Sequence, residues 1–180
     1  MTQTESEYKQ VIALCKDVFE KKTKDYGTAW RILRLPSITD QILIKAQRIR
    51  SIQEKGEQKV EEDIKNEFIG IINYSIIAII QESLPKDAPL EISVKDLMPK
   101  YEEVAEETLQ LLLNKNHDYG EAWRDMRVSS ITDIILMKLY RVKQIEDNQG
   151  KTIISEPIKA NYQDMINYAV FCLIKFEEER

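Results

Sequence analysis

The chain has 180 residues, of which 43% are hydrophobic and 32% are charged, and its formal net charge at pH 7 is −5. This length suits one domain or two small ones, and the acidic balance gives no strong field to attract duplex nucleic acid or an anionic membrane. Because the chain has only five Gly and five Pro, a sheet-rich fold with many tight turns is disfavoured.

No targeting or membrane segment is evident at the start or in the interior of the chain. The first ten residues, MTQTESEYKQ, lack the basic and apolar regions of a signal peptide. The most apolar run, residues 68–80, is too short to span a bilayer. Cys15 and Cys172 each lie in an apolar helical pattern, so we expect small buried hydrophobes in a reducing compartment. These features predict a cytoplasmic protein.

The first predicted helix carries apolar side chains at helical spacing, i, i+3, i+4 and i+7. They are Tyr8, Val11, Ile12, Cys15, Val18 and Phe19. We expect this helix to stop at Asp-Tyr-Gly, with Gly27 in a left-handed conformation because glycine has no Cβ atom.

A second and a third helix are predicted to follow. The second is expected to begin at Ser37, because Ser-Ile-Thr-Asp places Asp40 at the spacing of a capping box. The third, residues 64–80, is apolar nearly all round, which is typical of a helix at the centre of a bundle. The next segment, residues 84–99, contains three prolines and breaks the helical periodicity.

The same pattern then repeats. At an offset of 93, residues 22–48 and 115–141 are identical at 16 of 27 positions. Further along, at an offset of 94, the third helix has its counterpart at residues 158–176. The second copy has its own expected helix stop at Gly120 and its own expected cap at Ser130 and Asp133.

We therefore predict an all-α fold made by tandem duplication of a three-helix unit. Its parts are a first repeat (1–83), a linker (84–99) and a second repeat (100–180). One trio alone would expose much apolar surface, so the two should pack as one six-helix bundle with pseudo-two-fold symmetry. The two third helices are the expected central contact.

Ten cations occur at matching positions of the two repeats: Lys22, Arg31, Arg34, Lys45, Arg48, Lys115, Arg124, Arg127, Lys138 and Arg141. Some of them flank the start of the middle helix, where free N–H groups favour an anion, so the set predicts phosphate binding. Four aromatic residues nearby could stack a base: Tyr26, Trp30, Tyr119 and Trp123. Alternatively, the tryptophans anchor the core and the cations form a structural ion-pair network with the neighbouring acids.

One carboxylate stands on a comparable face of each third helix, at different steps. The first repeat has Glu67 with Gly70 one turn later, whereas the second has Asn161 and then Asp164. Such acids are costly unless they are paired or bound to metal, so Glu67 and Asp164 are candidate Mg²⁺ ligands that could meet near the pseudo-two-fold axis. In the alternative interpretation, each acid pairs with a base of its middle helix.

Candidate catalytic groups are Asp118, Asp133 and Asp164. If Asp164 is functional, Gly70 makes the first repeat impaired or auxiliary to the second. His117 has Lys24 as its counterpart, so we interpret it as a surface residue without a metal or catalytic part.

The repeated pattern K-x-x-D-Y-G-x-A-W, followed by S-I-T-D-x-I-L-x-K-x-x-R and a helix with N-Y-A/S, resembles the nucleotide-modification-associated domain family. The resemblance covers about 60 residues in each half and implies a helical domain of bacteria and phages that is associated with nucleotide or DNA-base modification. A looser likeness is to all-α nucleoside triphosphate pyrophosphatases, which bind Mg²⁺ through E-E-x-x-E motifs. Glu102, Glu103 and Glu106 fit that spelling, but the first repeat has no counterpart, so we interpret the match as coincidental.

Two functions are therefore predicted as alternatives. The first is a nucleotide-binding protein, with Mg²⁺ as a candidate cofactor for action on a nucleotide phosphate. The second is a non-enzymatic structural or protein-interaction module whose D-Y-G-x-A-W loops lock the fold. A small-molecule nucleotide is the expected partner in the first case, and a homo-oligomer is compatible with both.

Overall fold

The computed structural model describes residues 1–56, 61–154 and 157–179, with the side chains of Glu61 and Tyr119 excepted. These residues contain no strand and form six α-helices and two short 3-10 helices. The first repeat contains α1 (Gln3–Tyr26), η1 (Ala29–Ile32), α2 (Leu35–Lys55) and α3 (Glu61–Ser83). The second contains α4 (Val94–Tyr119), η3 (Ala122–Asp125), α5 (Val128–Asp147) and α6 (Ile158–Glu178). The all-α prediction is confirmed.

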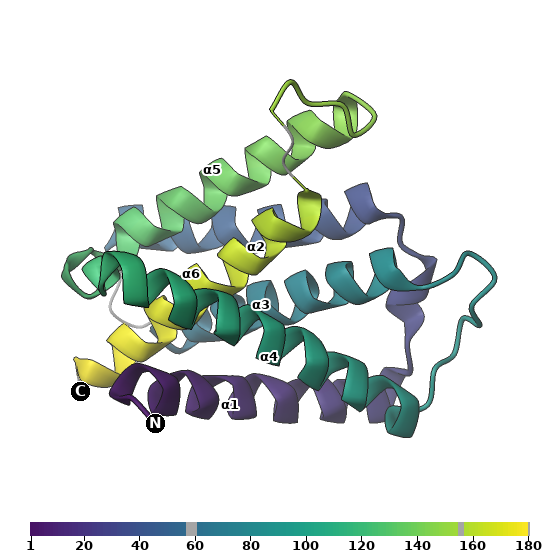
Figure 1. Ribbon diagram of the computed structural model, residues 1–180, viewed down its shortest axis with the longest axis horizontal. Helices are drawn as coiled ribbons and strands as arrows, with labels where there is room; N and C mark the ends of the chain where they lie inside the picture. The colour runs from purple at the N-terminus through teal and green to yellow at the C-terminus, as the bar shows by residue number, and fades with distance from the viewer. Residues whose placement is uncertain (57–60, 155–156, 180) are drawn as a thin grey trace.

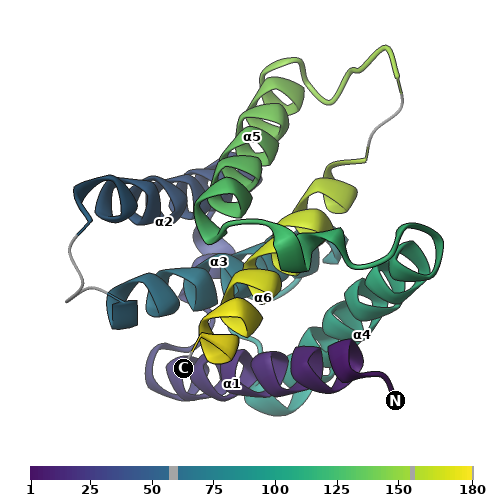
Figure 2. The same cartoon turned by 90° about the vertical axis from the view of Figure 1, so that its left-hand side faces the viewer.

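The helices form three layers, and each layer contains one helix from each repeat (Figures 1 and 2). Helices α3 and α6 lie in the middle layer, with α2 and α5 on one side and α1 and α4 on the other. The contacts between helices follow pseudo-two-fold symmetry. The first helix of each repeat packs on the third helix of the other, so α1 contacts α6 and α4 contacts α3. The two repeats therefore share one core, as the apolar third helices predicted.

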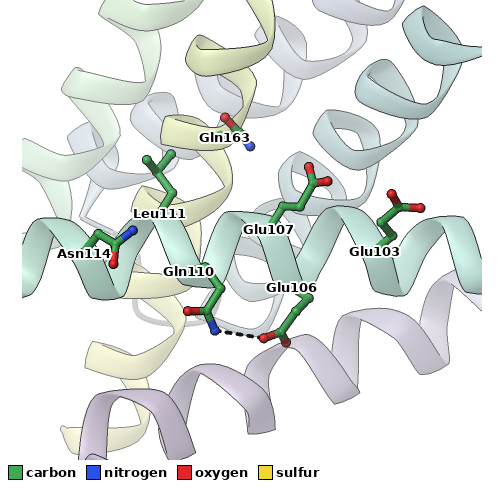
Figure 3. A pocket seen from close by; sticks show the side chains of 7 residues that line it. All are labelled: Glu103, Glu106, Glu107, Gln110, Leu111, Asn114 and Gln163. Carbon is green, nitrogen blue, oxygen red and sulfur yellow. Dashed lines mark hydrogen bonds between the residues drawn. The ribbon is translucent and has the colours of Figure 1, made fainter.

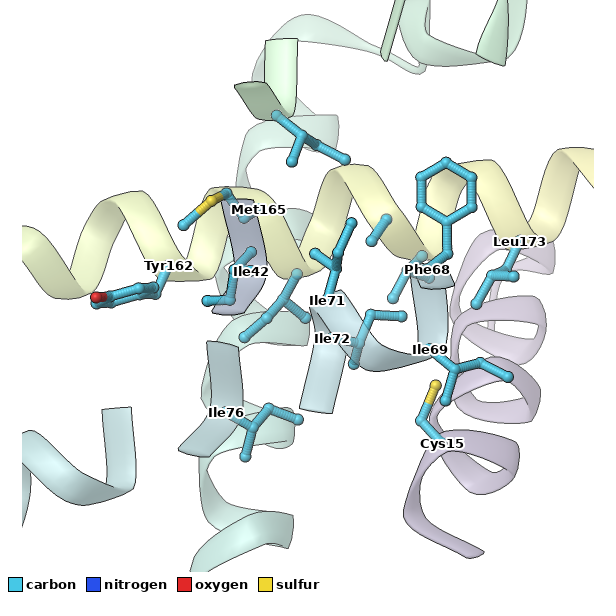
Figure 4. Packing of buried hydrophobic residues seen from close by; sticks show 14 of the residues in the cluster. Cys15, Ile42, Phe68, Ile69, Ile71, Ile72, Ile76, Tyr162, Met165 and Leu173 are labelled. Atoms are coloured by element: carbon cyan, nitrogen blue, oxygen red, sulfur yellow. The ribbon is translucent and has the colours of Figure 1, made fainter. Parts of the chain in front are cut away.

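Helices α3 and α6 pack against each other in the middle of the core (Figure 4). Phe68, Ile72 and Met165 are fully buried there. The cysteines are buried as predicted, and burial raises the pKa of Cys15 to about 12, so its thiol stays protonated at neutral pH. Within the described ranges, no helix combines the length and apolar content needed to cross a membrane.

Crossed hydrogen bonds between tyrosine and asparagine tie the two repeats together inside this core. The Tyr8 hydroxyl donates to Asn167 Oδ1 at 2.8 Å, and the Tyr101 hydroxyl donates to Asn73 Oδ1 at 2.7 Å. Each bond joins the first helix of one repeat to the third helix of the other. Each asparagine amide also donates to a backbone carbonyl of its own repeat's first helix. The pairs are thus structural and follow the pseudo-symmetry.

Helices α1 and α4 end at the predicted glycines, but the glycine conformation differs from the predicted one. Gly27 has φ 64° and ψ −150°, and Gly120 has φ 74° and ψ −163°. A positive φ with an extended ψ lies outside the left-handed helical region and is open mainly to glycine. The chain therefore leaves each helix directly into the following 3-10 turn.

The predicted capping boxes are wrong. The middle helices begin earlier, at Leu35 and Val128, with the N-cap residues Arg34 and Arg127 and no side-chain cap. The 3-10 turn ends only two residues before α2, and Pro36 in its first turn fits helical φ, so the helix starts at once.

The acids of the Ser-Ile-Thr-Asp segments pair across the repeats instead of capping their own helices. Asp40 accepts from Lys143 Nζ at 2.7 Å, and Asp133 lies 3.6 Å from Arg50 Nη1. The two pairs occupy equivalent positions and join α2 to α5. Asp133, a predicted catalytic candidate, is therefore placed in an exposed inter-repeat ion pair.

The predicted linker is shorter than expected, because residues 94–99 are already helical. Ser93 caps α4, with its hydroxyl accepting from the Asp96 N–H at 3.2 Å. Pro99 lies inside this helix, in its second turn. Before the helix, the Leu90 carbonyl accepts from the Thr28 hydroxyl, so the connecting segment is held against the first loop.

Candidate functional site

The third helix of each repeat holds the backbone of the D-Y-G-x-A-W loop. In the first repeat, Gln81 Nε2 donates to the carbonyls of Arg31 and Leu33, each at 2.9 Å. In the second, Lys175 Nζ donates to the Arg124 carbonyl at 2.7 Å. Gln81 and Lys175 occupy equivalent positions, but their residue types differ, so identity between the repeats does not reveal them. The only signal was their common register on the third helix.

A cavity of about 480 Å³ lies between α1, the loop, α2 and α3. We call it the first-repeat cavity. Its lining residues are Val18, Phe19, Lys22, Thr23, Tyr26, Gly27, Ala29, Trp30, Lys45, Asn66, Ile69, Gly70, Asn73, Tyr74 and Ile77. Four predicted site residues are among them, namely Lys22, Tyr26, Trp30 and Lys45.

Two lysines provide the only charged side chains among the described residues that line this cavity. The stem of Lys45 crosses α3 at Gly70, where a Cβ atom would lie 2.8 Å from Lys45 Cδ. Its ammonium group lies 5.5 Å from the Tyr74 ring centroid and 3.8 Å from Glu67 Oε2. Lys22 is exposed and forms no ion pair within the described part of the chain. Glycine at position 70 therefore makes room for a lysine beside the cavity.

The equivalent lysines of the second repeat are bound to an aspartate. Lys115 Nζ lies 3.0 Å from Asp164 Oδ1, and Lys138 Nζ lies 3.1 Å from Asp164 Oδ2. Asp164 stands at the position of Gly70. Because both oxygens of one carboxylate are engaged, this site holds its own internal anion.

The tryptophans of the two loops also differ. Trp123 is buried and stacks on Phe171, with ring centroids 4.2 Å apart and an angle of 3° between the planes. Phe171 is the counterpart of Ile77, which lines the first-repeat cavity. Trp30 is only partly buried. Trp123 therefore anchors the core, whereas Trp30 packs against the core and also lines the first-repeat cavity. The Tyr119 side chain lies outside the described residues.

The two loop arginines point toward protein groups outside the cavity. Arg31 donates to Gln81 and to the carbonyls of Ala88, at 2.9 Å, and Pro89, at 3.2 Å. This set of bonds fastens the first loop to the connecting segment.

Arg124 is the centre of a larger network in the second repeat. It bonds Glu7 at 3.0 Å and Glu121 at 2.7 Å, and it also pairs with Glu178. Its guanidinium lies 4.3 Å from the Trp123 ring centroid. The second loop is therefore locked to α1 and to the end of α6.

The remaining predicted cations do not line the first-repeat cavity. Arg48 bonds Glu67 at 2.7 Å. The others are Arg34, Arg127 and Arg141, all exposed. Glu67 and Asp164 are thus each paired with basic residues of their own repeat. This is the arrangement expected under the alternative interpretation, in which each acid pairs with a base of its middle helix. Asp118 is exposed beside His117, which lies on the surface as predicted.

The three glutamates of the E-E-x-x-E motif lie on α4, and two of them, Glu103 and Glu106, line a shallow surface pocket of about 540 Å³ (Figure 3). The third, Glu102, pairs with Lys16 instead. Glu106 accepts from Gln110 Nε2 at 2.9 Å and points away from Glu103 and Glu107. Over residues 1–56, 61–154 and 157–179, no three His, Cys, Asp or Glu side chains are grouped so that they could hold a metal ion. Among the described residues, the E-E-x-x-E motif is therefore not part of an acidic cluster that could hold a metal ion.

The Arg124 network provides a stability prediction. Arg124→Ala should lower the free energy of unfolding by about 1–3 kcal/mol, because it removes charged hydrogen bonds and leaves three glutamates close together. Thermal denaturation at pH 7 measures this loss. Lys9→Ala, which removes an exposed pair with Glu5, is the matched control and should have little effect; an equal loss in both variants would contradict the network's role.

The same network makes the difference in stability between wild type and Arg124→Ala depend on pH. A hydrogen bond from the Thr4 hydroxyl, and then the bonds from Arg124, lower the pKa of Glu121 from its ordinary value of 4.5. A lowered carboxyl pKa stabilises the folded state above the ordinary value, and this contribution is lost as pH falls through the lowered pKa. The gap in melting temperature between wild type and Arg124→Ala should therefore narrow as the pH falls below the ordinary carboxyl pKa of 4.5.

Comparison with known protein families gives a match in both halves of the chain. The family described as nucleotide modification associated domain 1 matches residues 22–81 and residues 115–176. These two segments begin at equivalent lysines near the ends of α1 and α4, and each extends into the last turn of its third helix. Comparison with curated proteins and with solved structures gave no significant match. The chain belongs to the nucleotide modification associated domain 1 family, and it contains two copies of that domain.

Proposed function

We propose that this protein binds a mononucleotide in the first-repeat cavity and serves a system that modifies nucleotides or DNA bases. The single observation that carries the proposal is the juxtaposition of two lysines and four aromatic side chains around one cavity of about 480 Å³. Binding cavities for small molecules are commonly about 300–1,000 Å³ in volume. Lysine binds phosphate as a point charge, and aromatic faces stack on bases.

The divergence between the repeats supports one site per chain. Gly70 and Ile77 leave space and lysine charge available in the first repeat, whereas Asp164 and Phe171 occupy the matching positions of the second. If Asp164 were the functional residue, the first repeat would instead be impaired or auxiliary to the second, so the proposal departs from that expectation. The family's association with nucleotide modification makes a nucleotide the ligand class to test first. A cytoplasmic, bacterial setting is part of the same proposal.

Thermal denaturation with a panel of ribonucleotides and deoxynucleotides tests the proposal. A ligand that binds only the folded state at about a hundredfold above its Kd stabilises it by about 2.7 kcal/mol. For a chain of this length we expect the melting temperature to rise by roughly 5–10 °C. The double variant Lys22→Ala and Lys45→Ala should lose this rise.

The matched control changes two lysines of α1, Lys21 and Lys24, to alanine. Both are exposed and neither lines the cavity, so the net charge changes equally while binding should persist. No rise with any nucleotide, or an equal loss in both double variants, would overturn the proposal.

The second candidate function is a structural or protein-interaction module. The observation that favours it is the second loop, where Arg124 bonds three glutamates and Trp123 stacks on Phe171. On this hypothesis both loops lock the fold. Arg124→Ala and Lys138→Ala would then lower the melting temperature through lost ion pairs alone. The result that distinguishes this hypothesis is that no nucleotide would bind either repeat.

A further inference from the structure

We infer, on the basis of the proposed function, that the ligand of the first-repeat cavity is a nucleoside monophosphate that binds without a divalent metal ion. The inference names the phosphate state and the metal requirement of the site. It rests on two observations: two lysines line the cavity, and no carboxylate does.

The positive charge at the cavity matches one phosphate monoester. Lys22 and Lys45 supply two ammonium groups, and a phosphate monoester carries about −1.5 to −2 at pH 7. Lys45 lies 3.8 Å from Glu67, a distance at the edge of an ion pair, and Glu67 has a closer partner in Arg48 at 2.7 Å. Glu67 therefore leaves Lys45 able to bind another anion. A triphosphate would carry more negative charge than two lysines neutralise.

The lining offers no carboxylate to a metal ion. Mg²⁺ is usually held by one or two carboxylates together with substrate phosphates. Among the described residues that line the cavity, no aspartate or glutamate is present, and the other polar groups of the lining are neutral, such as the amide of Asn66. Glu67 and Glu91 are next to the lining residues Lys45 and Gly27 but do not themselves line the cavity. The position where the second repeat has an acid, Asp164, is Gly70 here. A phosphate would therefore be met by lysine directly.

The apolar part of the cavity lining suits a base. Val18, Ile69 and Ile77 provide an apolar surface, and Trp30 and Tyr26 come from the loop at its edge. Tyr26 is 73% exposed, so its ring can close onto a ligand without leaving a core position. Stacking on an aromatic face contributes about 1–3 kcal/mol per base.

Isothermal titration calorimetry with the whole chain tests the inference. The probes are the monophosphates of adenosine, guanosine, cytidine, uridine and thymidine, with the matching nucleosides and triphosphates, each in Mg²⁺ and in EDTA. At least one monophosphate should bind with one site per chain and with an affinity that changes less than about twofold between Mg²⁺ and EDTA. Its nucleoside and its triphosphate with Mg²⁺ should each bind at least about tenfold more weakly.

The outcomes separate this inference from the proposed function. Tighter binding of a triphosphate that requires Mg²⁺ overturns the inference and leaves nucleotide binding intact. A nucleoside that binds as tightly as its monophosphate also overturns it, because the lysines would then not contribute. If none of the probes binds in either buffer, both the inference and the proposed function fail.

Discussion

Replacing Asn167 with alanine should lower the free energy of unfolding by about 2–3 kcal/mol, because the buried Tyr8 hydroxyl loses its acceptor and a cavity replaces the amide. Asn167 is 5% exposed and Tyr8 is 1% exposed, so water cannot readily replace the lost bond. For a chain of this length, the loss corresponds to a fall in melting temperature of roughly 5–10 °C. Thermal and urea denaturation, followed by circular dichroism, measure it.

The matched control is Asn114→Ala, at an exposed position of α4, which should change the melting temperature little. A double-mutant cycle with Tyr8→Phe isolates the bond itself. Tyr8→Phe should cost about 1 kcal/mol in the wild type and close to nothing in the Asn167→Ala background. Additive losses would show that the hydrogen bond between the repeats contributes nothing.

The double variant Gly70→Asp and Ile77→Phe should weaken binding of a mononucleotide at least about tenfold. These changes give the first repeat the residues that the second has at positions 164 and 171. The aspartate would pair with Lys45, as Asp164 pairs with Lys138 at 3.1 Å, and the phenylalanine ring would reach toward Trp30. Calorimetric titration measures the affinity, and denaturation of the same sample reports whether the fold is intact.

Ile44→Phe is the control for the bulk of the new ring, because Ile44 is 59% exposed on α2. It should bind the nucleotide as the wild type does. In the single variant Gly70→Asp, the new Cβ atom would lie 2.9 Å from Lys45 Cε, so the end of the lysine side chain must move. This variant should therefore weaken binding by itself. Unchanged affinity in a folded double variant would place the ligand elsewhere.

Divergence after duplication explains why the repeats are unequal. The third helices carry their acids one turn apart, at Glu67 and Asp164, and each acid binds the lysine of its own middle helix. Because the first repeat has its acid at Glu67, position 70 can be glycine, and this glycine leaves space for the cavity. The second repeat instead uses Trp123 and Phe171 as a stacked pair, which contributes about 0.5–1.5 kcal/mol beyond the area that it buries.

Much of the fold was predictable because it depends on local patterns. Apolar periodicity located the helices, and Gly27 and Gly120 marked where α1 and α4 end. The start of the middle helix was misplaced because the Ser-Ile-Thr-Asp segment satisfies a local rule, while the actual start follows from the preceding 3-10 turn. The partner of Asp40 is Lys143, more than one hundred residues away, and no local rule identifies such a pair.

The sequence by itself determined the duplication, the helical class and the set of side chains that each repeat offers, since these follow from residue identity and spacing along one chain. Only the tertiary structure decided which of those side chains share a cavity. Lys22, Lys45 and Gly70 line one cavity, while Lys115 and Lys138 both pair with Asp164. The physical reason is that an open site depends on the volume and charge at facing positions of different helices, and only packing brings those positions together.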